Sequence, residues 1–184
     1  MKIKQLLLVL VLAFVGISKT NAQSYIKINP ITLAFGFFGV EYEQVVGNKN
    51  SFTANAGFYT FGSDLTGRYT GFGAGGGYRF YISKADAPEG LFIEPNVGIS
   101  FLTYKYGTGF GGTTGSDFGY TNLSIGAIIG YQWLFSDDQF SFNIGIGPGV
   151  GIALGKNDSF TGSLSGTGFS PTGTLGIGYR ISGK

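Results

Sequence analysis

The chain has 184 residues, of which 12% are charged, 16% are aromatic and 34 are glycines. Soluble domains usually carry about 25% charged residues, so we expect much of this surface not to meet water. The chain has no cysteine and no histidine, which excludes disulfides, thiolate catalysis, histidine metal sites and histidine-based triads. The composition shows no break, so one domain is the simplest count.

The first 22 residues have the pattern of a secretory signal peptide. A basic start is followed by an apolar run from Leu6 to Ile17, which is too short for a membrane helix. The small residues Thr20-Asn21-Ala22 predict cleavage before Gln23, so residues 1–22 are the expected signal and 23–184 the expected barrel domain. Cleavage leaves nine basic and ten acidic residues. We therefore predict no basic patch and no nucleic-acid partner.

Large apolar residues alternate with small or polar ones along most of the mature chain. From Phe140 to Leu154, the even positions are large and apolar or proline, and the odd positions are small or polar. A period of two is typical of a β-strand with two unlike faces. We expect eight such strands, at about Tyr25–Phe35, Phe37–Val46, Phe52–Phe61, Tyr69–Ser83, Leu91–Tyr106, Tyr120–Phe135, Phe140–Gly155 and Thr167–Ser182.

The junction between the first two strands decides the strand count. Leu33 and Phe35 put odd positions on the apolar face, whereas Phe38 and Val40 put even positions there. A change of parity needs a bulge or a turn, and Gly36 is its expected place. A bulge would leave seven strands. A turn is favoured because single-chain bacterial barrels have even strand counts.

The connections between the predicted strands alternate in length. Those after the second, fourth and sixth strands are compact, and those after the third, fifth and seventh are mostly longer, at Gly62–Arg68, Gly107–Gly119 and Lys156–Gly166. Outer-membrane barrels have short periplasmic turns and longer outer loops. The pattern predicts a bacterial outer-membrane protein with both termini in the periplasm. Loops 107–119 and 156–166 would then face a surface partner.

One face of each strand is consistently apolar and is expected to face lipid. The opposite face is rich in glycine, which has low β propensity. A narrow lumen of eight strands explains this face, because few large side chains fit inside it. A soluble barrel would reverse the arrangement and carry a charged exterior. An aromatic girdle is expected at the headgroups of the periplasmic side, formed by Tyr78, Tyr131, Trp133 and Tyr179.

Charged and amide side chains on the inward face gather toward the periplasmic ends of the strands. Strand pairing places Arg79 opposite Glu94 and Gln132 opposite Asn143. It also brings Arg180 within reach of Glu43. Because an unpaired buried charge costs several kcal/mol, we predict a polar plug that closes the lumen; a proton or ion relay and a catalytic acid are the alternatives. The predicted network comprises Glu41, Glu43, Arg79, Glu94, Gln132, Asn143 and Arg180.

The chemical motifs in the chain predict no catalytic, cofactor or metal site. The segment Gly71–Gly76 matches G-x-G-x-x-G, but a strand follows it where nucleotide binding requires a helix. No loop has the spaced oxygen ligands that Ca²⁺ needs. An enzyme without histidine would need a serine beside a glutamate or lysine base, and the inward Ser100 and Ser124 have no such partner in the sequence.

Two other functions remain as alternatives to a non-enzymatic envelope barrel. The first is a barrel that binds or transports a small apolar ligand or lipid, with Tyr59, Tyr81 and Phe92 lining the site. The second is a lipid-modifying outer-membrane enzyme, which needs the missing nucleophile and base.

Short motifs spread over most of the mature chain resemble those of small outer-membrane β-barrel proteins of Bacteroidetes-type bacteria, including a family of uncharacterised function. They are the cleavage site before Gln23, Asn29-Pro30 with Leu33, Tyr42-Glu43, Gly77-Tyr78-Arg79-Phe80-Tyr81, Ala87-Pro88-Glu89-Gly90-Leu91-Phe92 and Gly178-Tyr179-Arg180-Ile181. The wider resemblance is to eight-stranded barrels of the OmpA and OmpX type.

This resemblance implies an anchoring, adhesive or envelope-stabilising role without enzymatic activity or a cofactor. It also implies outer-membrane lipid and the barrel assembly machinery as partners. Barrels of this type often end in an aromatic residue that the assembly machinery recognises. This chain ends in Ser182-Gly183-Lys184 instead, with Tyr179 as its last aromatic residue.

Overall fold

The computed structural model describes residues 23–34, 36–63, 65–107, 118–154 and 167–183. The expected signal peptide, residues 1–22, lies outside the described residues. So does most of the two long loops to which we assigned a surface partner.

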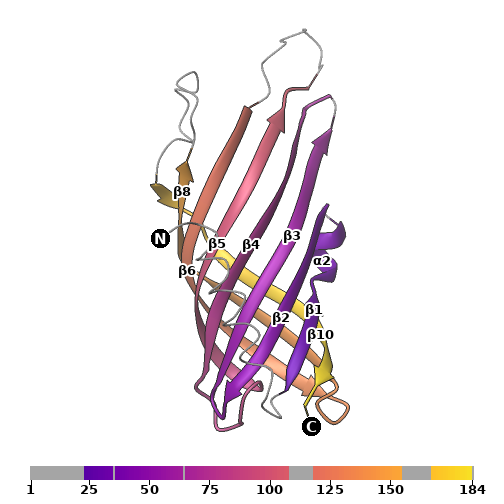
Figure 1. Ribbon diagram of the computed structural model, residues 1–184, viewed down its shortest axis with the longest axis vertical. Coiled ribbons are helices and arrows are strands. Elements are labelled where there is room, and N and C mark those ends of the chain that lie inside the picture. Colours follow the sequence, from indigo (N-terminus) through magenta and orange to yellow (C-terminus); the bar gives the residue numbers. More distant parts are fainter. Residues whose placement is uncertain (1–22, 35, 64, 108–117, 155–166, 184) are drawn as a thin grey trace, which may run out of the picture.

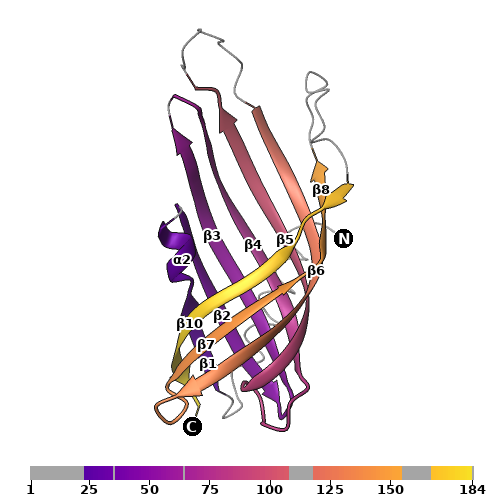
Figure 2. The same ribbon diagram turned by 180° about the vertical axis from the view of Figure 1, so that it is seen from behind.

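The described residues form a closed antiparallel up-and-down barrel of eight strands, which confirms the predicted fold class (Figures 1 and 2). Strand β1 closes the barrel by pairing with β2 on one side and with β10 on the other. The first six strands are β1 (Ser24–Ile28), β2 (Phe37–Gly47), β3 (Asn50–Ser63), β4 (Gly67–Tyr81), β5 (Gly90–Lys105) and β6 (Phe118–Phe135). The seventh consists of β7 (Phe140–Gly147) and β8 (Gly149–Leu154), and the eighth of β9 (Thr167–Phe169) and β10 (Thr172–Ser182).

Proline causes both interruptions in the last two strands. Pro148 separates β7 from β8, and Pro171 lies between β9 and β10. Proline has no backbone N–H to donate to a ladder. Each broken strand still continues along its neighbour, because β6 pairs with β7 over one half of its length and with β8 over the other.

The first strand is shorter than predicted because Pro30–Ala34 form a short helix, α2. Proline suits the first turn of a helix, and Asn29 caps it by accepting a hydrogen bond from the backbone N–H of Thr32 at 3.1 Å. The chain leaves the helix through Gly36, whose φ of 81° favours glycine. The reversal is therefore a helical turn that ends at Gly36, and the count of eight strands holds.

The parity change predicted at Gly36 came from treating the helix as a strand. Leu33 belongs to α2, and the outward residues of β1 are Ile26 and Ile28, at even positions like those of β2. Phe35, the other residue in that prediction, lies outside the described residues.

The connection between β3 and β4 is also shorter than predicted. Much of the expected loop 62–68 belongs to the two strands, and Ser63 pairs with Gly67. Gly62 and Gly67 have φ values of 102° and 103°, which bend the chain tightly at this point. In Figure 1, β3, β4, β5 and β6 consequently rise above the rest of the barrel wall.

The apolar face of the strands lies on the outside of the barrel. Phe72, Ile125 and Ile129 are 57%, 53% and 53% exposed, respectively. Large apolar side chains outside and a glycine-rich lumen match the predicted arrangement for lipid contact. No helix among the described residues is long and apolar enough to span a bilayer.

The barrel has two unlike ends. We call the end with the connections 48–49, 82–89 and 136–139 the turn end, and the opposite end the loop end. Tyr131 and Trp133 lie on the outer surface near the turn end, with ring centroids 4.6 Å apart. Tyr179 is exposed in the same region and accepts a hydrogen bond from Gln139 at 2.8 Å. With Tyr78, which lies outward on β4 against Phe80, these are the aromatic residues predicted for the girdle.

Candidate functional site in the lumen

A cluster of charged and amide side chains fills the turn-end half of the lumen. Its charged residues come from four strands, with Lys27 on β1, Glu41 and Glu43 on β2, Arg79 on β4 and Glu94 on β5. Each occupies an inward position of its strand, because alternate residues of a strand point to opposite faces. Together with Gln132 on β6, we call these residues the plug.

Arg79 is the centre of the plug and is fully buried. Its Nε donates to Glu94 Oε2 at 2.5 Å, and its Nη2 donates to Glu41 Oε1 at 2.9 Å. Its Nη1 donates to Gln132 Oε1 at 3.1 Å and to Glu43 Oε2 at 3.3 Å. The planar guanidinium group provides five donors in a fixed geometry. One side chain therefore ties together strands β2, β4, β5 and β6.

Lys27 is the second cation of the plug and is 1% exposed. Its Nζ lies 2.5 Å from Glu43 Oε2 and 3.4 Å from Glu41 Oε1, and it donates to Gln132 Oε1 at 2.8 Å. These contacts connect the closing strand β1 to β2 and, across the lumen, to β6.

Glu43 receives more hydrogen bonds than the other carboxylates of the plug and is fully buried. Besides both cations, it accepts from the hydroxyl of Tyr81 at 2.7 Å, from Gln132 Nε2 at 3.1 Å and from Ser51 Oγ. Glu94 similarly accepts from Thr53 Oγ1 at 3.0 Å. Buried carboxylates need such donors because each one loses its hydration shell.

The plug contains three carboxylates and two cations. Its formal charge is therefore negative by one when all groups are ionised. Glu41 is 17% exposed, so the carboxylate with the most contact to solvent lies at the loop-end side of the plug.

Aromatic and aliphatic side chains complete the closure. Tyr81, Phe92 and Ile128 form a buried apolar cluster inside the barrel. The guanidinium carbon of Arg79 lies 4.6 Å from the ring centroid of Phe92, a cation–π geometry. Nearer the turn end, the hydroxyl of Tyr25 donates to the backbone oxygen of Asp138 at 2.7 Å.

The structure brings five of the predicted network residues into contact, and the other two, Asn143 and Arg180, lie apart from them. Arg79 binds Glu94, Glu41, Glu43 and Gln132. Asn143 stands opposite Gln132 in the ladder of β6 and β7, but it donates to Thr174 Oγ1 at 3.0 Å instead of joining the plug.

Among the described residues, the cations that pair with Glu43 are Lys27 and Arg79, and Arg180, which was predicted to lie within its reach, is not one of them. Arg180 pairs with Tyr25 across the ladder of β1 and β10. Lys27, on the strand between them, occupies the place beside Glu43 that the prediction gave to Arg180.

Lys27 is the main functional residue that sequence reasoning missed. The predicted first strand assigned odd positions to the lipid face, because it used Leu33 and Phe35 to set the parity. The observed strand ends at Ile28 and has the opposite parity. The available signal was a lysine between Ile26 and Ile28, since a charged residue flanked by apolar ones in a lipid-facing strand belongs on the inside.

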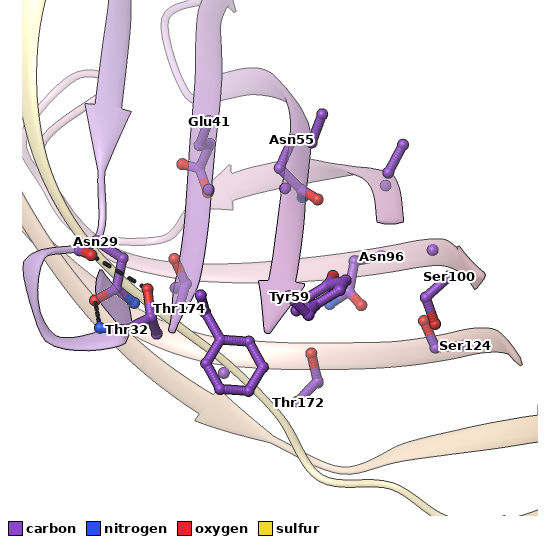
Figure 3. Close-up of a pocket in the computed structure, with 18 of the residues that line it drawn as sticks. Asn29, Thr32, Glu41, Asn55, Tyr59, Asn96, Ser100, Ser124, Thr172 and Thr174 are labelled. Atoms are coloured by element: carbon purple, nitrogen blue, oxygen red, sulfur yellow. Dashed lines mark hydrogen bonds between the residues drawn. The ribbon is translucent and has the colours of Figure 1, made fainter. Parts of the chain in front are cut away.

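Above the plug, the loop-end half of the lumen contains a cavity of about 670 Å³ (Figure 3). Lys27, Glu41 and Glu94 of the plug border it on the turn-end side. Its walls combine apolar side chains, such as Phe37, Leu102 and Ile128, with small uncharged polar ones, among them Asn55, Asn96, Ser100, Asn122, Ser124 and Thr172.

The residues considered for other chemistry are divided between these two regions. Tyr81 and Phe92 are buried in the plug region, whereas Tyr59 lines the cavity. Ser100 and Ser124 also line the cavity, and neither forms a hydrogen bond to a glutamate or lysine within the described ranges. In the same ranges, no group of three or more acidic side chains is arranged to hold a metal ion.

Comparison with known proteins identifies the family. Residues 6–170 match the model of a family described as "Protein of unknown function (DUF3575)", and the chain belongs to this family. No curated protein and no solved structure matches the chain.

Proposed function

We propose that this member of the DUF3575 family is an integral outer-membrane barrel whose lumen is closed by the plug and which catalyses no reaction. Its role would be to stabilise the envelope or to present its outer loops to a surface partner, as in barrels of the OmpA and OmpX type. The observation that carries the proposal is the buried network of Arg79 and Lys27 with three glutamates, which connects strands β1, β2, β4 and β5 across the lumen.

The outer surface supports a membrane location. Exposed apolar side chains such as Phe72, Phe80 and Ile146 would be costly in water. A closed barrel also leaves no exposed sheet edge, which is the condition for a β-structure to cross a bilayer. Outer-membrane lipid and the barrel assembly machinery are the partners that this proposal requires.

The proposed orientation places the turn end in the periplasm. The connections there are short, and Ser24 and Ser182 lie together at this end. The C-terminus is drawn beside the same turns in Figure 1. The residues of loops 107–119 and 156–166 that would meet a surface partner lie mostly outside the described residues.

Fractionation of expressing cells tests the location. The protein should enter the outer-membrane fraction and run as a compact band in an unboiled detergent gel that shifts on boiling. A fully soluble periplasmic protein would overturn the proposal. In planar bilayers, the purified barrel should show no stable channel, and a steady ohmic conductance would refute the closed lumen.

A further inference from the structure

Glycines shape the loop-end cavity. A Cβ added at Gly75 would meet Asn55 Oδ1 at 3.1 Å, and one added at Gly98 would meet Ser124 Oγ at 2.9 Å. A Cβ at Gly151 would similarly meet Asn122 Oδ1 at 3.1 Å. Polar side chains from neighbouring strands therefore lie flat over these glycines. This arrangement lines the wall with hydrogen-bonding groups and leaves the space between the walls open.

These wall groups have unused hydrogen-bonding capacity. Within the described part of the chain, the side chains of Asn55, Asn122 and Ser124 form no hydrogen bond. Each amide offers both donors and an acceptor, and each hydroxyl can do either. A ligand with hydroxyl groups distributed around its rim can satisfy such a mixed set, since every hydroxyl also donates and accepts.

The cavity also has an aromatic wall. Tyr59 and Phe37 line it with ring centroids 5.4 Å apart in an edge-to-face arrangement, and Phe61 stacks on Phe37 at the same distance. Flat aromatic faces favour contact with the C–H face of a saturated ring. Figure 3 draws Tyr59, Asn55 and Asn96 among the side chains that line the cavity, so its wall carries both aromatic and amide groups.

Charged and apolar ligands fit this cavity less well. The plug carries excess negative charge, which repels an anion. A cation would have to compete with Arg79 and Lys27, which already pair with Glu41 through Oε1 and neutralise most of the charge there. An apolar ligand would cover the amides of Asn55 and Asn122 without replacing their bonds to water, and a buried polar group without a partner costs about 1–3 kcal/mol.

We propose that the loop-end cavity binds a small neutral polyhydroxyl molecule of the sugar class, one ring of which packs against Tyr59 while its hydroxyls bond the amides of Asn55 and Asn122. The volume of about 670 Å³ lies within the roughly 300–1,000 Å³ of small-molecule sites. The site is blind on its turn-end side, because the plug borders it there. The proposal rests on the closed lumen of the proposed function and adds a ligand to it.

Saturation-transfer NMR on the folded barrel tests this ligand class. An amine-oxide detergent is used, since sugar-headed detergents would compete for the site. Glucose and maltose are the neutral probes, and glucuronate, glucosamine and cyclohexanol are anionic, cationic and apolar probes of similar ring size. Saturation should reach the neutral sugars and not the other three.

Matched leucine variants locate the binding. Asn55→Leu and Asn122→Leu should each raise the dissociation constant about tenfold, which corresponds to the loss of ~1.4 kcal/mol. Asn48→Leu, in the turn between β2 and β3, is the control and should leave it unchanged. Octyl glucoside, tested beside glucose, distinguishes a lipid-linked sugar from a free one, and binding of either one supports the sugar chemistry.

Three results would overturn the inference: no saturation of any sugar, saturation of cyclohexanol or a charged probe as strong as that of glucose, or binding unaffected by the two cavity variants. A heat-modifiable band for each sample shows that the barrel is folded. If the barrel is folded, lies in the membrane and does not conduct, but no sugar binds, the proposed ligand class is refuted and the proposed function is unaffected.

Discussion

The two halves of the lumen differ in how their polar side chains are satisfied. In the plug, Arg79, Glu43 and Gln132 are fully buried and each bonds three or more side chains. In the cavity, Asn122 and Ser124 form no hydrogen bond with any described residue. The long strands thus contribute to one half that is filled with charged groups and to another that is hollow and has uncharged side chains above the plug.

The difference teaches that side-chain size, and not strand geometry, decides whether this lumen is closed. Strand number and stagger set the diameter of a barrel, and the long strands β3, β4, β5 and β6 run through both halves (Figure 1). On β4, the inward positions near the turn end are Arg79 and Tyr81, whereas those toward the loop end are Gly71, Gly73 and Gly75. One strand therefore contributes large polar groups to the plug and empty space to the cavity.

Removal of the central cation should produce the largest effect. Among the described residues, Arg79→Ala leaves Glu94 without a paired cation and leaves Glu41 and Glu43 paired with Lys27 alone. Breaking a buried ion pair by deleting one partner costs about 3–5 kcal/mol, so the free energy of unfolding should fall by about that amount. Urea titration of the barrel in lipid vesicles, followed by Trp133 fluorescence, measures the change.

Lys84→Ala is the control for this experiment, because Lys84 is an exposed cation in the connection that follows the same strand. Its effect should stay within about 0.5 kcal/mol, as for most surface substitutions. Equal unfolding free energies for the wild-type protein and Arg79→Ala would contradict the central role of Arg79.

Removal of the Gln132 amide from the plug should produce the next largest loss in the free energy of unfolding. Gln132 Oε1 accepts from both Lys27 and Arg79, and its Nε2 donates to Glu43. Gln132→Leu keeps a similar volume and removes all three bonds to charged groups, so stability should fall by about 1.5–3 kcal/mol. The same urea titration measures this loss, and an unchanged midpoint would show that the plug does not depend on its amide.

Much of the barrel could be predicted because the alternation of apolar with small or polar residues indicates which face of each strand meets lipid. The lipid face is a local property of each strand, and the neighbour relationships follow from short turns. This reasoning was enough to pair Arg79 with Glu94, whose strands are joined by the compact connection 82–89.

One group of missed features depends on the segment Pro30–Ala34, where alternation does not apply. The helix Pro30–Ala34 shortens β1, and this reverses the side to which Lys27 points. Contacts across the lumen, such as that of Lys27 with Gln132, also involve strands far apart in the sequence. No local pattern encodes them, and for this reason the pairing of Lys27 with Glu43 was not predicted.

A smaller test concerns the contact between the apolar cluster and the charged network. Tyr81 belongs to the cluster with Phe92, yet its hydroxyl donates to Glu43 at 2.7 Å. Tyr81→Phe removes this one bond and leaves Glu43 with Lys27, Ser51 and other donors. We expect a loss of about 0.5–1.5 kcal/mol in the urea titration, and a loss as large as that of Arg79→Ala would mean that the hydroxyl organises the plug.

The smallest expected effect comes from the cavity, in a variant matched to Gln132→Leu. Asn122 lies on the same strand, β6, and also points into the lumen, but its side chain bonds no described residue. Asn122→Leu removes an amide that only solvent satisfies, so the free energy of unfolding should change by less than about 0.5 kcal/mol. A loss comparable to that of Gln132→Leu would mean that the cavity is structurally organised like the plug. A negligible loss would assign the stabilising polar contacts of this lumen to its turn-end half and leave the amides of the loop-end half available for a ligand.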